Sequence, residues 1–192
     1  FYLMEMGEIK FRIPNKNAIS EVIIIDDSSM NDRKGKDKVQ MQREIVLNNL
    51  CELLDRSDVI IDRDENGAPF FSDDTLPFIS ISHSNNWFAL QLGKEDRVGV
   101  DIQVMKLDIE KGMRYFVNEK EEKALEINSL NLNLIWAAKE AVYKYKKGKL
   151  EYYKEAMTVL SIETDSLLVE VDNEQVKCTY LIQEDFVLVY ID

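Results

Sequence analysis

Short apolar runs bounded by turn residues dominate the first 93 residues and predict β-strands. One longer segment differs, because between Lys38 and Leu54 the apolar residues recur at helical spacing and predict a helix. The expected strands of this half are Glu8 to Ile13, Glu21 to Ile25, Phe78 to Ser82 and Trp87 to Leu92. Between the helix and the third strand, the residues from Asp64 to Gly67 are typical of a turn.

The second half repeats this mixture of strands and helices in another order. A short apolar run, VGVDIQ at residues 98–103, precedes a helical stretch of roughly Asp108 to Asn128 with a break near Phe116 to Asn118. A further helix is expected from Leu132 to Lys147, because Gly148 after a lysine-rich turn is a typical helix stop. Four strands are expected in the tail: Thr158 to Ile162, Leu167 to Val171, Val176 to Ile182 and Phe186 to Ile191.

Neighbouring strands are joined by short turns throughout the chain, which favours antiparallel sheets. The pattern therefore predicts an antiparallel α+β fold. Each side of about Gly93 holds a helix and several strands. We therefore expect two halves, residues 1–93 and residues 94–192.

The run VGVDIQ carries two polar residues in an apolar strand. Side chains two positions apart in a strand share a face, so Asp101 and Gln103 project together while Val100 and Ile102 face the other way. One interpretation is a half-exposed strand with its polar residues turned outward. The other is that the carboxylate and the amide have a chemical task.

The predicted helix IWAAKEAVYKYKKGKL, residues 135–150, also carries a polar stripe. Trp136, Glu140 and Lys144 are spaced by four and lie along one face. An amphipathic helix with a Glu–Lys pair in solvent is one interpretation. A tryptophan in line with these charges favours a partly buried stripe instead.

The charge balance limits the class of partner. The chain of 192 residues holds 36 acidic residues and 24 lysines and arginines, for a net charge of −12. Generic nucleic-acid binding needs a cationic surface, so this composition argues against it. The first 25 residues contain no cationic start followed by an apolar run, and no stretch approaches a transmembrane span. We therefore expect a cytoplasmic protein that does not bind membranes. For Cys51 and Cys178, two buried free thiols are favoured over a disulfide.

The only histidine, His83, ends a predicted strand in the sequence ISHS. A turn histidine without a task is one interpretation. The other is a phosphate contact, because imidazole and hydroxyl groups donate hydrogen bonds to anions.

Taken together and in order, ISHS, GVDI and WAAKEAVYK resemble the 4′-phosphopantetheinyl transferase superfamily. The gaps also agree, with 18 residues from His83 to Asp101 and 39 from Asp101 to Glu140. The length and layout resemble the larger, monomeric subgroup. In that subgroup two similar halves, each an antiparallel sheet packed with helices, are related by a pseudo-two-fold axis.

The resemblance implies transfer of the phosphopantetheine arm of coenzyme A to a serine of an acyl or peptidyl carrier protein. It implies a Mg²⁺ ion held by Asp101, Gln103 and Glu140, with Glu140 and Lys144 as catalytic residues. The coenzyme A contacts that it implies are Arg43, Ser82, His83, Lys139 and Lys144. A basic patch beside the site, including Lys146, Lys147 and Lys149, is expected to steer the carrier protein.

Two departures from the family pattern keep other functions open. Gln103 stands where the family has a glutamate, so one negative charge is missing at the metal. The family's Gly-Lys-Pro before the Ser-His strand is Gly67-Ala68-Pro69 here, so a cation near the nucleotide is missing. The alternatives are a degenerate member that binds coenzyme A or a carrier without catalysis, and an acidic α+β interaction module.

Overall fold

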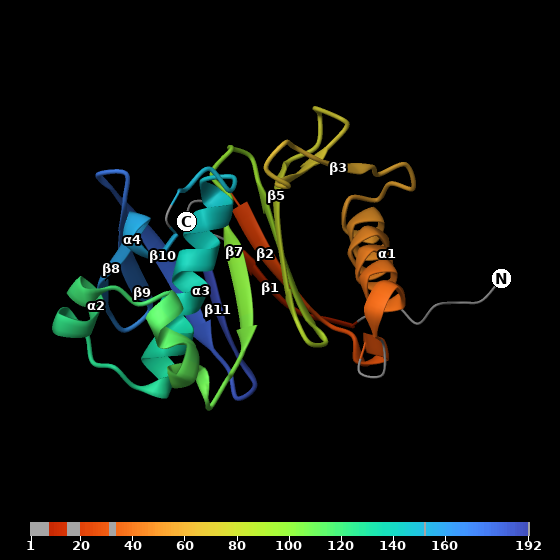
Figure 1. Cartoon of the computed structure of the whole chain (residues 1–192). Helices are drawn as coiled ribbons and strands as arrows, with labels where there is room; N and C mark the ends of the chain where they lie inside the picture. The colour runs from red at the N-terminus through yellow and green to blue at the C-terminus, as the bar shows by residue number, and fades with distance from the viewer. Residues whose placement is uncertain (1–7, 15–19, 31–33, 152, 192) are drawn as a thin grey trace.

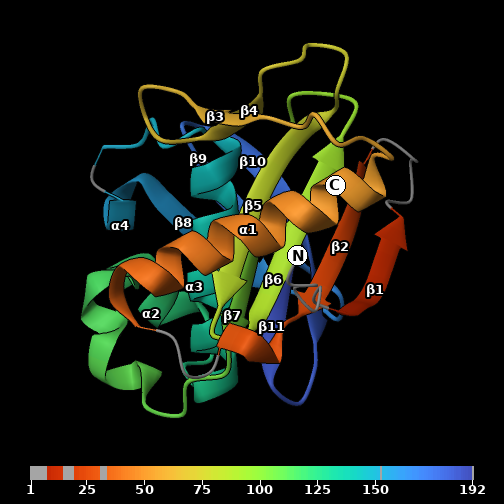
Figure 2. The same cartoon turned by 90° about the vertical axis from the view of Figure 1, so that its right-hand side faces the viewer.

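The computed structural model describes residues 8–14, 20–30, 34–151 and 153–191 and arranges them in two larger antiparallel sheets and a small hairpin. The first sheet has the strand order β1-β2-β6-β5. Its strands are β1 (Glu8–Pro14), β2 (Ser20–Asp26), β5 (Phe78–Ser84) and β6 (Trp87–Gly93). A short 3₁₀ helix, Ser28–Met30, follows β2. Helix α1 (Gly35–Leu53) runs across one face of this sheet (Figure 2).

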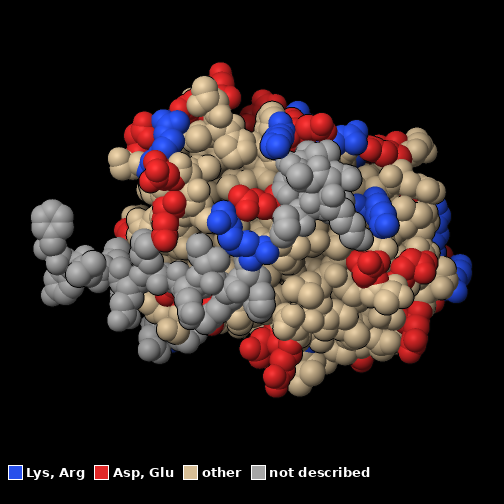
Figure 3. All heavy atoms as spheres, turned by 180° about the vertical axis from the view of Figure 1, so that it is seen from behind, with Lys and Arg blue, Asp and Glu red and all other residues tan. Residues whose placement is uncertain are grey.

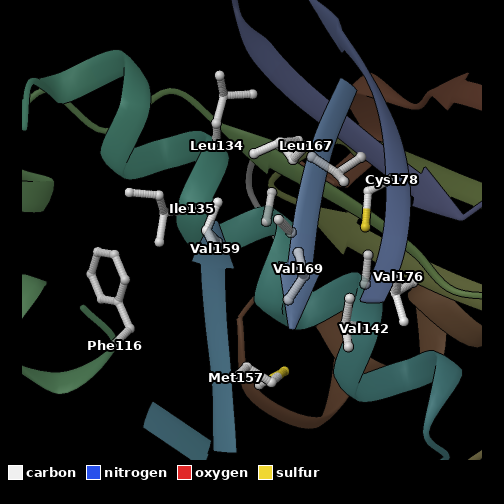
Figure 4. Close-up of a cluster of buried hydrophobic side chains, with 14 of the residues drawn as sticks. Phe116, Leu134, Ile135, Val142, Met157, Val159, Leu167, Val169, Val176 and Cys178 are labelled. Atoms are coloured by element: carbon white, nitrogen blue, oxygen red, sulfur yellow. The ribbon is translucent and has the colours of Figure 1, made fainter. Parts of the chain in front are cut away.

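The second sheet has the order β7-β11-β10-β9-β8, and α3 covers one of its faces (Figure 1). Its strands are β7 (Val100–Val104), β8 (Met157–Ile162), β9 (Ser166–Val171), β10 (Glu174–Ile182) and β11 (Phe186–Ile191). Between β7 and β8 lie a 3₁₀ helix (Ile109–Tyr115), α2 (Glu119–Ala124), α3 (Ser129–Tyr145) and α4 (Tyr153–Ala156). Figure 4 shows the core in which apolar side chains of α3 meet those of β8, β9 and β10.

A third apolar cluster joins the two sheets. On the first sheet, Val22, Ile24 and Ala89 point away from α1; on the second, β7 and β11 turn their other face toward them. The layers therefore run from α1 through the two sheets to α3. The residues of this cluster are Val22, Ile24, Ala89, Val100, Ile102, Phe186, Leu188 and Tyr190. Because both halves of the chain contribute to it, burial of this cluster holds the two sheets together.

A buried amide adds a polar tie to this apolar contact. The Gln91 side chain on β6 is fully buried. Its Nε2 donates to the carbonyl oxygen of Ile191 at 2.7 Å, and its Oε1 accepts from the Gly99 amide at 2.8 Å. A buried amide needs such partners, so this pairing fixes how the start of β7 lies against the first sheet.

The predicted α+β fold with antiparallel sheets packed by helices is confirmed. Helices α1 and α3 and most strands lie within a few residues of the predicted bounds. The predicted helical stretch from Asp108 to Asn128 is a 3₁₀ helix followed by α2, and α4 was not predicted. The turn before Pro69 belongs to a hairpin, β3 (Ile61–Arg63) and β4 (Pro69–Phe71), that we did not predict, because three-residue strands show no clear alternation. The predicted domain boundary at residue 93 coincides with the end of β6, and the division into two domains stays a proposal.

Both cysteines are free, as expected; Cys178 is buried and Cys51 partly so. None of the helices in the described part of the chain is long and apolar enough to cross a membrane. On the face shown in Figure 3, acidic and basic side chains are interspersed.

Candidate functional site

The structure brings the strand VGVDIQ and the helix WAAKEAVYK into direct contact. Asp101 on β7 and Lys144 on α3 form an ion pair, with 2.7 Å between Oδ1 and Nζ. Lys144 also donates to the carbonyl oxygen of Val100 at 2.9 Å. Asp101 is buried, so the interpretation of VGVDIQ as a half-exposed strand is wrong. A buried carboxylate needs such a partner, and one face of α3 supplies it.

Gly99 is the reason that β7 and α3 approach so closely. A β-carbon at this position would lie 2.3 Å from the carbonyl oxygen of Ala141 and 2.9 Å from Cβ of Tyr145. Ala137, Ala138 and Ala141 of α3 are fully buried, and their small side chains allow a close approach of the helix. The sequence GVD therefore combines a glycine that admits the helix with the carboxylate that the helix contacts.

Glu140 lies one turn before Lys144 on α3 and is half-buried. Burial raises the pKa of the Glu140 carboxyl, and the nearby charge of Asp101 raises it further. Interaction with Tyr153 and the charge of Lys144 oppose this shift. The site therefore holds two carboxyl groups close enough to repel each other.

Tyr153, at the start of α4, is a member of the site that sequence reasoning missed. Its hydroxyl is buried beside Glu140 but has no hydrogen bond of good geometry. Burial and the Glu140 charge raise the pKa of this hydroxyl, so it stays protonated. Its ring packs against Trp136 and Tyr143, with centroids 6.2 and 5.7 Å away. No spacing in the sequence indicates this contact, which depends on the fold of residues 146–156.

Gln103 shares the buried face of β7 with Asp101, as the alternation predicts. Its Nε2 donates to the carbonyl oxygen of Val104 at 2.6 Å. Its side-chain oxygen accepts no hydrogen bond from any residue that the structure describes. The amide therefore keeps an oxygen that a cation or a water molecule can use, without the charge of a glutamate.

Ser82 and His83 lie on opposite faces of β5, so their side chains point in different directions. The Ser82 hydroxyl faces β7 and donates to Asp101 Oδ1 at 2.7 Å. The His83 ring stacks on Phe88 on the α1 side, with centroids 5.9 Å apart. Burial lowers the pKa of His83, and the cations Lys144 and Lys38 lower it further. The imidazole is therefore neutral at neutral pH and offers a hydrogen-bond donor rather than a charge to a phosphate.

Lys139 points away from Asp101 into a buried network. Its Nζ pairs with Glu121 Oε2 at 2.9 Å, and both side chains are fully buried. The same Nζ donates to the carbonyl oxygens of Phe116 at 2.6 Å and Lys154 at 3.3 Å. All three ammonium donors are thus used inside the protein, which does not support the prediction that Lys139 binds coenzyme A.

Arg43 lies on α1, is exposed, and has no hydrogen bond or ion pair with another described residue. The structure therefore leaves its predicted role as a proposal. The expected basic patch is partly neutralised within the chain. Lys146 pairs with Asp172 and Glu174, and Lys147 pairs with Asp96.

A cavity of about 880 Å³ opens beside Lys144. Its lining includes residues of the segment 63–81, Tyr143 and Lys144 of α3, and Lys147 just beyond the end of that helix. Arg63 lies in this wall and donates to the carbonyl oxygen of Gly67 at 2.6 Å. The family pattern has a lysine at the position of Ala68, which cannot supply a cation. The guanidinium of Arg63, bound to the neighbouring Gly67, brings a positive charge close to that position.

A divalent cation fits the donor set of Asp101 and Glu140, which lie near Lys144. Mg²⁺ is commonly held by one or two carboxylates together with substrate phosphates and water. Asp101 and Glu140 supply two carboxylates, and a cation would relieve both the cost of burying Glu140 and its repulsion by Asp101, which together raise the pKa of Glu140. No group of three His, Cys, Asp or Glu side chains arranged for a metal occurs among the described residues, consistent with an amide at Gln103.

Comparison with known proteins agrees with this geometry. Residues 97–190 match the family model described as the 4′-phosphopantetheinyl transferase superfamily. The match includes β7, α3 and all the strands of the second sheet. None of the curated proteins matches the chain.

Proposed function

Because residues 97–190 belong to the 4′-phosphopantetheinyl transferase superfamily, we propose that the protein transfers the 4′-phosphopantetheine arm of coenzyme A to a serine of an apo carrier protein. The match to this superfamily supports phosphopantetheine transfer in general and implies coenzyme A and a carrier protein as partners. The dependence on Mg²⁺ and the holo-acyl-carrier-protein synthase type are our proposal. The observation that supports it most is the meeting of Asp101 with Lys144 and Glu140, where Lys144 also lines a cavity of about 880 Å³.

The reaction breaks a phosphorus–oxygen bond of the coenzyme A pyrophosphate. The carrier serine oxygen attacks the phosphorus that bears the pantetheine arm, and adenosine 3′,5′-bisphosphate leaves. Glu140, or a water beside it, accepts the serine proton, because its raised pKa makes it a stronger base than an exposed carboxylate. Lys144 stabilises the negative charge on the leaving phosphate. Mg²⁺, held by Asp101, Glu140 and Gln103, would neutralise the pyrophosphate charge.

The cavity is the proposed coenzyme A site. Lys144 and Arg63 line it and can bind phosphates, whereas Lys147 in the same wall already pairs with Asp96. Phe70 and Phe78 are partly exposed and give an apolar wall suited to a base or a pantetheine chain. Arg63 is our proposed replacement for the cation missing at Ala68. Ser80 and Ile81 of β5 lie in the wall, whereas Ser82 does not.

The experiment is incubation of the protein with coenzyme A, Mg²⁺ and several apo carrier proteins, followed by intact mass measurement. A gain of one phosphopantetheine group on the carrier is expected. We predict that Asp101→Ala and Glu140→Ala each abolish the gain while the circular dichroism spectrum stays that of the wild type. Normal transfer by either folded variant would overturn the assignment of that residue.

A second function, binding of coenzyme A or of a carrier without catalysis, is favoured by the neutral Gln103. It predicts a thermal shift with coenzyme A but no mass gain on any carrier. An interaction module without a small-molecule site predicts neither result. Acyl and peptidyl carriers from fatty acid, polyketide and nonribosomal peptide synthesis are the candidate substrates, and a monomer is the form that we propose.

A further inference from the structure

Three serines alternate along β5 and connect it to β7 in the other sheet. Ser80, Ser82 and Ser84 share one face of the strand, because side chains two positions apart point the same way. Each hydroxyl oxygen accepts a backbone N–H of β7: Val100 to Ser80 at 3.1 Å, Ile102 to Ser82 at 3.2 Å, and Val104 to Ser84 at 3.0 Å. The other edge of β7 pairs with β11, so the serines satisfy the N–H groups that would otherwise lack partners.

Ser82 differs from its neighbours in what its own proton does. It donates to Asp101 Oδ1 at 2.7 Å, whereas neither Ser80 nor Ser84 donates to a side chain among the described residues. Bonds to an ionised carboxylate are stronger than neutral ones. Lys144 reaches the same oxygen at 2.7 Å, so Asp101 is held from β5 and from α3 at once.

These bonds also decide what Ser82 cannot do. A serine hydroxyl has one donor, and Asp101 already takes it. The residue is only 5% exposed and is absent from the wall of the cavity. A phosphate accepts hydrogen bonds, so Ser82 has no free donor to offer one. This argues against the prediction that Ser82 contacts coenzyme A.

We propose that Ser82 is a positioning residue that orients the Asp101 carboxylate for its cation. The inference rests on the proposed function, because it takes Asp101 as a metal ligand. Both hydrogen bonds to Asp101 end on Oδ1, so Oδ2 takes neither and remains for the cation. Groups that orient a metal ligand commonly change metal affinity by about 10- to 100-fold when they are removed.

The test compares Ser82→Ala with Ser84→Ala as a matched control. Both variants remove one hydroxyl that accepts an N–H of β7, and only the first removes the bond to Asp101. Mn²⁺ binding in the presence of coenzyme A, without carrier, is measured by calorimetry. We expect Ser82→Ala to bind Mn²⁺ about 10- to 100-fold more weakly, and Ser84→Ala to stay within about 2-fold of the wild type. Ser82→Cys, which fills the same space with a weak donor, should resemble Ser82→Ala.

Two results of this test would overturn the proposal. One is an equal loss of Mn²⁺ affinity in Ser82→Ala and Ser84→Ala, which would mean that only the connection between the strands matters. The other is weaker coenzyme A binding by Ser82→Ala with unchanged Mn²⁺ affinity, which would restore the phosphate contact.

A second measurement separates this proposal from the proposed function. If the wild-type protein binds no Mn²⁺, the metal assignment fails, and crystal structures of the metal-free variants decide the role of Ser82. The Asp101 carboxylate should move from its place in Ser82→Ala and keep it in Ser84→Ala. An Asp101 carboxylate that stays in place in Ser82→Ala would refute the positioning role.

Discussion

At the residue scale, the described part of the chain contains a buried and an exposed lysine–glutamate ion pair, whose contributions to stability can be compared directly. Lys139 and Glu121 are fully buried, whereas Lys123 and Glu119 pair at 3.6 Å with most of both side chains exposed. Removing one partner of a buried pair leaves an uncompensated charge and costs about 3–5 kcal/mol. An exposed pair contributes about 0–1 kcal/mol. We predict that Lys139→Met lowers the free energy of unfolding in urea by about 3–5 kcal/mol, and that Lys123→Met changes it little. Equal effects of the two variants would contradict the assignment of Lys139 to a structural network.

Glu140 carries the second prediction at this scale, a pH dependence of stability. Its pKa in the folded protein is raised above the unfolded value by burial and by Asp101, so the folded state favours the protonated form. The contribution of Glu140 to the free energy of unfolding is therefore most favourable below the pKa that this residue has in the unfolded chain. It is lost as the pH rises through the higher pKa that the residue has in the folded protein. Glu140→Gln should therefore raise the melting temperature of the metal-free protein at neutral pH. The advantage should vanish near pH 4, and a constant difference across this range would show that the Glu140 charge does not destabilise the folded protein.

The same residues show how far the sequence alone leads. Asp101, Glu140 and Lys144 could be proposed as site residues because their motifs resemble those of the family, whereas the strand and helix periods predicted only which side chains share a face. The structural role of Lys139 could not be predicted, because its partner Glu121 lies in the charged run EKEEKA. Nothing in that run distinguishes a buried glutamate from its exposed neighbours. Only the capping box of Asn118 and Glu121 has a recognisable spacing there. Contacts between distant segments decide the rest.

At the scale of elements, the contact of β7 with α3 depends on Gly99. A β-carbon there would meet the backbone oxygen of Ala141, which cannot move without the helix. We predict that Gly99→Ala costs about 1–3 kcal/mol of stability, as overpacking of a core does, and that it lowers transferase activity by separating Asp101 from Lys144. Gly112→Ala is the control, because a β-carbon at Gly112 meets no atom within 4 Å. Full activity and stability of Gly99→Ala would show that the close approach is not required.

At the same scale, strand β5 could be predicted from the sequence, but its contact with the other sheet could not. The alternation of serine with isoleucine along β5 is visible in the sequence and predicts a strand with one polar face. It does not reveal that the polar face meets the edge of a second sheet, because hydroxyls that bind water and hydroxyls that bind N–H groups look the same in a sequence. The hairpin of β3 and β4, which carries Arg63 to the cavity, was missed because its strands are too short to show a period.

At the scale of the whole molecule, the two proposed halves share the apolar cluster that lies between the sheets. Val22, Ile24 and Ala89 of the first sheet pack on Val100 and Ile102 of the second. Gln91 adds hydrogen bonds to Ile191 and Gly99. A half produced alone would expose this apolar face and leave buried polar groups without partners, both of which cost free energy. The two halves should therefore unfold together.

The two tryptophans of the chain report on this prediction. Trp87 of the first half packs on Phe186 of the second with centroids 4.6 Å apart, whereas Trp136 lies within the second half beside Phe116 at 5.3 Å. Fluorescence of Trp87 in a Trp136→Phe variant, and of Trp136 in a Trp87→Phe variant, should each follow the urea midpoint of that variant's circular dichroism. Residues 94–192 produced alone should lack a cooperative transition, since the face of β7 and β11 that meets the first sheet would be exposed. Each half would be a domain that folds independently if fluorescence and circular dichroism gave different urea midpoints in one variant. A cooperative transition of the fragment 94–192 would mean the same.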